Sequence, residues 1–351
     1  MAARGVRVLV MGGEGSALLE RARSHAGLET FACRFSGLDF LNPVALARCR
    51  AFFVRNRVNR VVLGLPADLK AAGIAARLAG VSGIYYRRGS ALPVRDTALN
   101  RFLYGQVLTG LIVNSRETAR LVLEANPSLL PGERIHILSN GLDVAAFDAA
   151  YAAARPLRAK GDVPVIGNAG RLTEQKGQQF LLHMSRALRD RGIRHELVLA
   201  GKGEREAELK NLAERLGIAD AVVFAGFQAD MAPFWRSIDI FVLSSLWEGF
   251  GYVLAEALLA GKPAVAFNAN SMPEIIRPGE TGMLTPPPEE GEDAAAVGMR
   301  LADAVQTCLN NPGEAARLAM TGRAFCQEHF DQERCMDALY ALLWPAVNHA
   351  T

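Results

Sequence analysis

The sequence predicts an α/β protein of two doubly wound domains, each a parallel sheet with helices on both faces. Three observations predict this class. Short runs rich in Val, Ile and Leu alternate with longer amphipathic stretches, a pattern typical of parallel sheets covered by helices. The alternation pauses once, near residue 150, and then restarts. The chain has 351 residues, which suits two domains of about 100–200 residues each.

The first half contains six predicted strands. They are Arg7–Met11, Glu29–Phe35, Arg60–Leu65, Ile84–Arg87, Gly110–Asn114 and Ile135–Ser139. Amphipathic stretches between them, such as Val44–Asn56 and Glu117–Ala125, are predicted helices. Residues 1–150 are therefore predicted to form a first Rossmann-like domain.

The pause in the pattern predicts a linker. An alanine-rich stretch, Ala149–Ala154, is followed by Pro156, Gly161 and Pro164. Because Pro and Gly interrupt regular structure and mark domain boundaries, we interpret residues 151–162 as the interdomain linker. The alternative is a surface helix and loop inside one domain.

The second half, residues 163–336, repeats the alternation. Its predicted strands are Val165–Gly167, Glu196–Ala200, Val222–Ala225, Ile238–Ser244 and Ala264–Phe267, and its predicted helices are Lys176–Arg191, Arg205–Leu216, Tyr252–Ala260 and Ala294–Asn310. Two such domains in tandem predict a ligand cleft between the carboxyl ends of two sheets.

Composition excludes several protein classes. The chain is 50% hydrophobic and 21% charged, so disorder is not expected. Its five cysteines are scattered without a CxxC pair, which argues against a disulfide framework and a zinc site. The apolar run near the N-terminus is too short for a signal peptide, and no run reaches the length of a membrane span. We therefore expect a cytoplasmic protein.

Charge is distributed unevenly between the halves. Residues 1–150 carry 19 Lys and Arg against 11 Asp and Glu, whereas residues 151–351 carry 20 against 25. This asymmetry suggests that the first half meets an anionic partner. On charge alone, nucleic acid, a phosphorylated glycolipid and a membrane surface fit equally well, but the basic residues show no nucleic-acid recognition motif.

A segment with two carboxylates carries the strongest chemical signal. A predicted strand ends at Ser244, a glycine-rich turn holds Glu248, and the helix that follows holds Glu256. A carboxylate can accept hydrogen bonds from two vicinal hydroxyls of a sugar or ribose, and a helix N-terminus attracts phosphate. Glu256 lies among apolar residues, where an unbound carboxylate is costly. The alternative is a structural turn in which Glu248 caps the helix and Glu256 is solvated.

A second segment, 167–177, follows the first strand of the second domain. Arg171 and Lys176 lie where a helix begins, and together they could bind a diphosphate. Ordinary surface charges are the alternative. The segment lacks the Walker lysine pattern.

In this order, these segments resemble the family-4 retaining glycosyltransferases. The resemblance runs almost continuously through the second half. It covers Gly170-Arg171-Leu172 with Lys176-Gly177, Leu199–Gly203, Phe224–Phe227, the segment from Glu248 to Glu256, Gly261–Ala266, Met272–Ile276 and Gly282–Leu284.

The resemblance implies a GT-B fold in which the second domain binds a nucleoside-diphosphate sugar and residues 337–351 form a helix crossing back to the first domain. It implies catalytic roles for Arg171 and Lys176 at the diphosphate and Glu248 at the donor sugar. Glu256 would hold the ribose. The remaining donor-binding residues it implies are Gly13, Gly15, Asn140, Gly170, Gly201, Gly203, Phe227, Gly249, Phe250 and Gly251.

The sequence departs from the family at three places. No His follows the fourth strand, where Tyr85–Ser90 contains two arginines; Gly201-Lys202-Gly203 replaces Gly-Asp-Gly; and Asn270-Ser271 replaces a Gly-Gly pair. The third departure is the segment Asn270-Ser271-Met272 before Pro273 and Glu274. The first departure concerns the residue that faces the donor sugar, and the others bear on donor choice.

The acceptor is predicted from basic residues of the first domain. Arg87, Arg88 and Arg95 lie near the expected cleft and suit a phosphorylated acceptor such as lipopolysaccharide core. The basic helix from Arg48 to Arg57 suggests peripheral contact with an anionic membrane, at its inner face; a helix packed by its Phe residues is the alternative.

These features predict retaining transfer of a hexose-type sugar to a glycan or glycolipid hydroxyl, without nucleic acid and without a cofactor. No Asp-x-Asp motif occurs, so Arg171, Lys176 and a helix N-terminus would replace a metal ion at the diphosphate. The alternatives are a nucleotide-sugar epimerase on the same fold and a non-catalytic GT-B binding protein.

Overall fold

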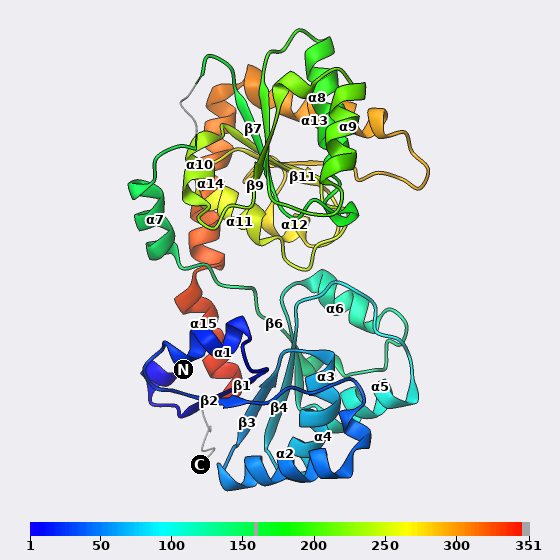
Figure 1. Cartoon of the computed structure of the whole chain (residues 1–351), viewed down its shortest axis with the longest axis vertical. Coiled ribbons are helices and arrows are strands. Elements are labelled where there is room, and N and C mark those ends of the chain that lie inside the picture. The colour runs from blue at the N-terminus through cyan, green and yellow to red at the C-terminus, as the bar shows by residue number, and fades with distance from the viewer. Residues whose placement is uncertain (158–160, 346–351) are drawn as a thin grey trace. The chain divides into compact units, whose positions relative to one another are not determined.

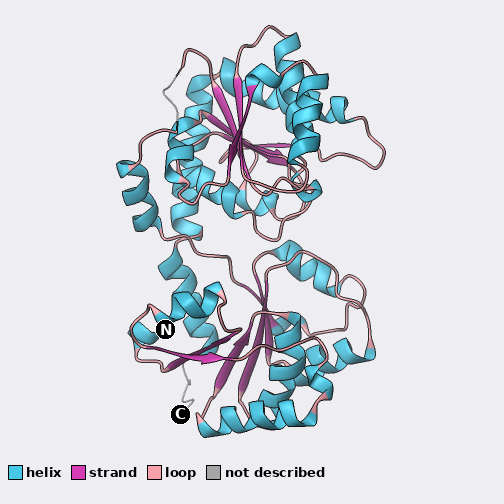
Figure 2. Cartoon of the chain, viewed as in Figure 1, coloured by secondary structure: helices cyan, strands magenta, loops and turns pink. Residues whose placement is uncertain are grey.

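The computed structural model describes residues 1–157 and 161–345, which form two compact units (Figure 1). Unit 1 comprises residues 1–114, 118–138 and 336 onward; unit 2 comprises residues 115–117 and 139–335. Both are α/β (Figure 2). The predicted linker includes residues 158–160 and the predicted final helix includes residues 346–351, which lie outside the described residues.

Unit 1 contains two parallel sheets. The larger has the order β3-β4-β5-β6, and the smaller pairs β1 with β2. Their bounds are β1 Val8–Gly12, β2 Leu28–Ala32, β3 Arg60–Leu63, β4 Gly83–Arg88, β5 Gly110–Val113 and β6 Ile135–Ile137. All six strands were predicted, each within a few residues. The separation of β1–β2 from β3 was not.

Helices cover the larger sheet of unit 1. They are α2 Pro43–Arg55, α3 Pro66–Asp68, α4 Ile74–Leu78, α5 Ala98–Phe102 and α6 Arg116–Leu123, with α1 Ala17–Arg23 beside the smaller sheet. Helix α2 shows how the local sequence determines this structure. The Asn42 side chain accepts hydrogen bonds from the amides of Val44 and Ala45, which caps the helix. Cys49 and Phe53, four residues apart on one face, are buried.

The chain returns to unit 1 at its C-terminal end. Helix α15, Gln332–Leu343, begins in unit 2 and ends in unit 1. Its last residue, Leu343, packs with Tyr85 and Ile112 in a small core cluster. The Arg60 Nε also donates a 2.7 Å hydrogen bond to the Leu343 carbonyl. Leu343, at the end of this helix, is therefore part of the first unit's core.

Unit 2 is built on a six-stranded parallel sheet of order β12-β11-β10-β7-β8-β9. The strands are β7 Val165–Ala169, β8 Glu196–Ala200, β9 Val222–Gly226, β10 Ile240–Leu243, β11 Ala264–Phe267 and β12 Met283–Thr285. Side chains alternate along β10: Phe241 and Leu243 join one buried cluster, and Ile240 and Val242 join another. A strand buried on both faces is typical of a doubly wound domain.

Helices lie on both faces of this sheet. They are α8 Gln178–Asp190, α9 Glu206–Arg215, α10 Ala232–Ser237, α11 Tyr252–Leu259, α12 Met272–Ile275, α13 Ala294–Asn310 and α14 Pro312–His329. The strand order reverses between β7 and β10, which are neighbours. Such a reversal opens a crevice at the carboxyl ends of the strands, the usual ligand position in open α/β sheets.

Unit 2 starts earlier than the predicted boundary at residue 150. Helix α7, Val144–Ala153, belongs to unit 2 because it packs against α10 and its Phe147 and Tyr151 lie against the unit 2 core. Arg236 of α10 lies 5.4 Å over the Tyr151 ring.

Of the helices in the described residues, none has the length and apolar character needed to span a bilayer.

Candidate functional site

The candidate site is formed by two loops of unit 2 at the strand-order reversal. One loop, residues 170–177, follows β7, and the other, residues 244–251, follows β10. Three hydrogen bonds join them: Leu246 N to Gln175 O at 2.8 Å, Gln175 Nε2 to Trp247 O at 2.8 Å, and Ser244 Oγ to Lys176 O at 2.9 Å. The loops therefore form one supported structure.

Lys176 and Glu248 form an ion pair at the centre of these loops. Their side chains are only 14% and 11% exposed. The Ser245 hydroxyl donates a 2.9 Å hydrogen bond to the same Glu248 oxygen. Because a buried charge is costly unless it is paired, each of these two residues compensates the other. The sequence predicted both as site residues but not that they bind each other.

Polar side chains behind the second loop fix the position of Glu248. Ser271 Oγ donates to the Glu248 carbonyl at 3.2 Å, and Asn270 Nδ2 donates to the Leu246 carbonyl at 2.8 Å. Asn270 has a φ of 52°, a left-handed conformation that Gly adopts readily and Asn tolerates. This explains how Asn270 can stand where the resembled family has glycine.

Arg171 lies at the exposed side of the first loop. Its Nη2 donates a 3.1 Å hydrogen bond to Gln175 Oε1, and its carbonyl accepts from Gln178 Nε2 at 2.9 Å. The backbone is thus held while the guanidinium meets solvent. A guanidinium in this position can bind two oxygens of an anion at once.

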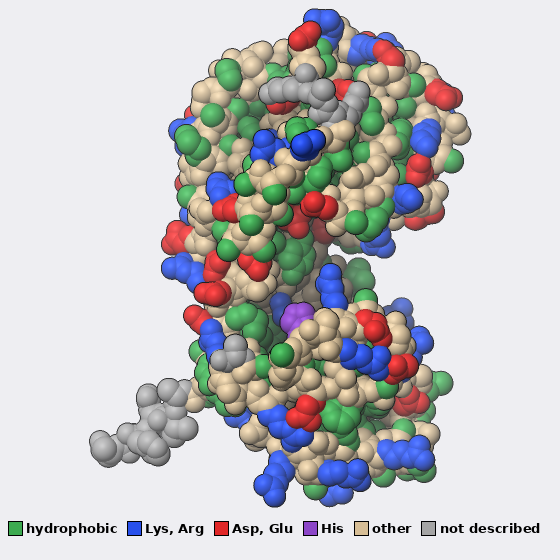
Figure 3. Space-filling view, turned by 60° about the vertical axis from the view of Figure 1, so that its left-hand side comes forward, with side chains coloured by type: hydrophobic (Ala, Val, Ile, Leu, Met, Phe, Trp, Pro, Cys, Tyr) green, Lys and Arg blue, Asp and Glu red, His purple; other side chains and the backbone are tan. Residues whose placement is uncertain are grey.

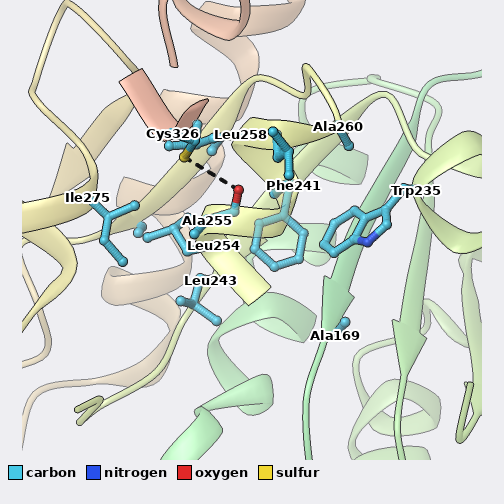
Figure 4. Packing of buried hydrophobic residues seen from close by; sticks show 14 of the residues in the cluster. Ala169, Trp235, Phe241, Leu243, Leu254, Ala255, Leu258, Ala260, Ile275 and Cys326 are labelled. Carbon is cyan, nitrogen blue, oxygen red and sulfur yellow. Dashed lines mark hydrogen bonds between the residues drawn. The ribbon is translucent and has the colours of Figure 1, made fainter. Parts of the chain in front are cut away.

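Glu256 projects from α11, which begins after Gly251. Gly251 has a φ of 84°, so the turn into the helix uses a conformation open to glycine. Leu254, Ala255 and Leu258 of the helix face the core, where Cys326 Sγ lies 3.5 Å from the Ala255 carbonyl (Figure 4). The partial burial of this carboxyl raises the pKa of Glu256 to about 7, because desolvation penalises its charged form.

Close packing requires glycine at two of the predicted donor-site positions. A Cβ on Gly201 would lie 1.8 Å from the Gly170 carbonyl oxygen, and one on Gly203 would lie 2.2 Å from that of Leu172. At Gly170 a Cβ would contact the Lys176 side chain at 3.3 Å. Glycines here let the β8 loop lie directly on the β7 loop.

Two predicted aromatic residues differ in environment. Phe227, after β9, is 70% exposed and available to stack on a planar ligand. Phe250 is 5% exposed and packs edge-on against Phe330 at 5.1 Å. In the second loop a ligand could therefore meet the partly exposed Gly249, but not the Phe250 ring.

The other predicted donor residues lie apart along the chain. Gly13 and Gly15 lie in unit 1, in the loop between β1 and α1, and Gly15 has a φ of 70°. Asn140 is a buried residue of unit 2. It precedes Leu142, which donates its amide to the Phe330 carbonyl at 2.7 Å.

The three predicted acceptor arginines of unit 1 do not share one environment. Arg87 and Arg95 are exposed. Arg88 is buried, donates from Nη2 to the Leu92 carbonyl at 2.6 Å, and lies beside the hydroxyls of Tyr86 and Tyr104. Successive residues of a strand face opposite sides of the sheet, so Arg87 and Arg88 must diverge.

Four residues that contribute to the site escaped the sequence prediction: Gln175, Ser245, Asn270 and Ser271. Asn270 and Ser271 carried a signal, since they replace a glycine pair of the resembled family. Gln175 and Ser245 carried none. Across the described residues, no group of three His, Cys, Asp or Glu side chains could hold a metal ion.

Comparison with known proteins places this site in a family. Residues 152–324 match the model for glycosyl transferases group 1. A GDP-mannose-dependent alpha-(1-6)-phosphatidylinositol monomannoside mannosyltransferase of Mycobacterium tuberculosis is 30% identical over 300 residues, 80% of this chain and 74% of that protein. The lipopolysaccharide core biosynthesis glycosyltransferase LpsE of Rhizobium meliloti is 32% identical over 182 residues, 52% of this chain. The alignments span 40–50% of the length of LpsE and two further curated relatives.

Solved structures show the same fold. Anabaena Alr3699/HepE in complex with UDP and glucose superposes with a TM-score of 0.77 at 22% identity, covering 97% of this chain and 93% of that one. Sucrose-phosphate synthase of Thermosynechococcus elongatus gives 0.75 at 21% identity, covering 97% and 90%. The predicted GT-B architecture of two Rossmann-like domains is thereby confirmed. On its sequence relatives, the chain belongs to the group 1 glycosyltransferases.

Proposed function

We propose that this protein is a family-4 retaining glycosyltransferase that moves a hexose-type sugar from a nucleoside-diphosphate sugar to an acceptor hydroxyl. The buried Lys176–Glu248 pair, with Glu256 in the helix that follows the same loop, carries the proposal. The pair sets a cation suited to a phosphate next to a carboxylate suited to hydroxyls, at the carboxyl ends of β7 and β10.

In this proposal the protein acts by stabilising charge. As the bond between the sugar and the diphosphate breaks, negative charge grows on the departing phosphate. Lys176, the exposed Arg171 and the amino end of α11 supply positive charge there. A metal ion is then not needed, and the departing phosphate oxygen takes the proton of the acceptor hydroxyl. Glu256 holds the ribose, Glu248 faces the donor sugar, and Phe227 lies beside the base.

We propose a cell-envelope glycolipid, such as a lipopolysaccharide core, as the acceptor. The names of LpsE and of the phosphatidylinositol monomannoside mannosyltransferase support a glycan or lipid-linked acceptor. The excess of basic residues before residue 150 supports an anionic one. Arg87 and Arg95, exposed in unit 1, suit its phosphates. Such an acceptor would place the protein in the cytoplasm, at the inner face of the membrane.

Thermal shift of the pure protein tests the donor site. We expect one of UDP, GDP and ADP to raise the melting temperature selectively in the presence of EDTA. Arg171→Ala and Glu256→Ala should abolish the shift, whereas Arg186→Ala, which removes an exposed arginine from α8, should keep it. A shift that requires a divalent cation would overturn the metal-independent part of the proposal. No shift with any nucleotide would overturn the transferase assignment.

Product analysis then tests the reaction. With the matching nucleotide sugar and an acceptor, NMR of the product should show the anomeric configuration of the donor. An inverted product would exclude retention. Conversion of the donor into a new nucleotide sugar without acceptor would identify an epimerase instead.

A further inference from the structure

Unit 1 contains a large cavity that the proposed reaction does not explain. Its volume is about 1080 Å³, and it lies between β1 on one side and β3 on the other. In unit 2 the corresponding strands at the order reversal, β7 and β10, are hydrogen-bonded. In unit 1 the described strands β1 and β3 are not neighbours in one sheet. The cavity occupies the position that a β1–β3 pairing would close.

The wall of the cavity is largely apolar. Side chains that contribute are Leu9, Met11, Phe35, Phe53, Val61 and Leu343. Val62 also lines it and is 44% exposed. A concave apolar surface of this size favours an apolar ligand, because its burial releases the water from both surfaces.

The border of the cavity is basic. Arg7 and Arg60 line it, but both already have partners. Arg7 forms an ion pair with Glu29 at 2.6 Å, and Arg60 donates a hydrogen bond to the Leu343 carbonyl. Arg34 and Arg57 also line it and are exposed. Within residues 1–157 and 161–345, no hydrogen bond or ion pair engages either of these two side chains.

The acidic contribution to the border is small. Asp68 is the single acidic side chain among the described lining residues. Its carboxylate already accepts the amide of Leu65 at 3.0 Å. Arg34 lies against Gly13, where an added Cβ would be 3.6 Å from its Cδ, so the Arg34 side chain lies beside the loop that follows β1. An apolar interior with two unpaired guanidiniums fits an amphiphile with an anionic head.

We propose that this cavity binds an acyl chain of an anionic lipid, with the lipid phosphate at Arg34 and Arg57. The inference deepens the proposed function and rests on it, since the lipid would be the anchor of the glycolipid acceptor. Neighbouring surface supports delivery from a membrane. On α2, Arg48 and Arg55 are exposed, and Figure 3 shows Lys and Arg side chains on the surface of unit 1.

A pair of tryptophan variants tests the site. Val62→Trp places a large ring in the cavity at a position already half exposed. Val54→Trp adds the same ring to an exposed position on α2 that does not line the cavity. The probe is a short-chain phosphatidic acid below its critical micelle concentration, titrated calorimetrically. We expect Val62→Trp to weaken binding at least tenfold and Val54→Trp to change it less than twofold.

Chain length and head charge provide two further measurements. Each added methylene that enters the cavity should tighten binding about fourfold, up to the length that fills it. The double variant Arg34→Ala/Arg57→Ala should weaken phosphatidic acid but leave a neutral diacylglycerol of the same chain length unchanged. Equal loss for both lipids would overturn the assigned phosphate position.

Cys33 reports on the cavity directly. It lines the cavity and is partly exposed, as is Cys335, whereas the other three cysteines are buried. In a Cys335→Ser background, phosphatidic acid should slow alkylation of Cys33. Rapid alkylation that lipid does not slow would contradict occupancy. Protection already complete without lipid would show that β1 has closed on β3 and that no cavity exists.

Nucleotide binding separates this inference from the proposed function. If both tryptophan variants bind lipid like the unaltered protein while UDP, GDP or ADP still raises the melting temperature, the lipid site fails and the transferase proposal stands. If lipid binds as expected and no nucleotide does, the transferase proposal fails and the cavity remains a lipid site without a donor.

Discussion

The charged residues of this protein show how strongly environment decides the role of one side chain. Arg171 is exposed and faces solvent, whereas Arg88 is buried beside two tyrosines. Glu248 is buried but paired with Lys176, whereas Glu256 is partly buried and has its pKa raised to about 7. The sequence predicted these residues as one functional group, and only their neighbours separate them.

Glu256 leads to a prediction about pH. Its folded-state pKa of about 7 lies above the value near 4.5 expected in the unfolded chain, so between these pH values the folded protein holds a proton that the unfolded chain has released. Stability should therefore fall as pH rises through this window, by about 3 kcal/mol in total. Glu256→Gln removes the ionisation and should match the unaltered protein at pH 4.5 but be more stable at pH 8.

Chemical denaturation at pH 4.5, 6 and 8 measures this difference. The same variant should bind the matching nucleoside diphosphate at least tenfold more weakly at pH 8, because a neutral amide is a poorer acceptor for ribose hydroxyls. A stability difference that does not change with pH would show that the Glu256 carboxyl is not titrating near 7.

The Lys176–Glu248 pair leads to a second prediction. Lys176→Met leaves the Glu248 carboxylate buried without its cation and should cost about 3–5 kcal/mol. Adding Glu248→Gln removes the uncompensated charge and should restore much of that stability. Neither variant should transfer sugar, since both lack the cation at the diphosphate. If the stability losses of Lys176→Met and Glu248→Gln, measured singly, add up to the loss of the double variant, the two residues are not coupled in solution.

At the scale of elements, strand and helix alternation predicted most of both units because buried strands are read directly from runs of Val, Ile and Leu. Strand β12 was not predicted. It is only three residues long, lies at the edge of the sheet and is followed directly by a proline, so it leaves little hydrophobic pattern in the sequence. The boundary of unit 2 was placed too late in the chain because Phe147 and Tyr151 of α7 pack on unit 2, a tertiary contact that local pattern does not contain. The placement of β1 and β3 in different sheets could not be predicted from local pattern either.

The loop that carries Glu248 leads to a prediction about Asn270. Asn270→Ala loses the bond to the Leu246 carbonyl and places a Cβ in a left-handed conformation, so it should cost about 2 kcal/mol. Asn270→Gly loses the bond but accepts the conformation, and should cost about 1 kcal/mol. Both should lower kcat more than they raise KM for the donor. Equal denaturation midpoints for the two variants would show that the left-handed conformation is not required.

At the scale of the whole molecule, the chain builds two cores and then ties its C-terminal end into the first. The core of unit 1 includes Leu343, which lies more than 200 positions along the chain from Tyr85 and Ile112, the strand residues that it packs with. Unit 2 has its own core around α13 and the six-stranded sheet. Local sequence pattern establishes each core separately. Local pattern alone did not predict that residues beyond 335 contribute to unit 1. That expectation came from the family resemblance.

Two cores of this kind predict two unfolding transitions in calorimetry. Leu343→Ala removes a buried side chain of unit 1 and should lower one transition, at a cost of about 2–5 kcal/mol. Leu301→Ala does the same in α13 of unit 2 and should lower the other. The nucleoside diphosphate that binds should raise only the transition sensitive to Leu301→Ala, because a ligand stabilises the unit that holds it. If each variant lowers both transitions equally, the units unfold as one and the donor site depends on the integrity of both.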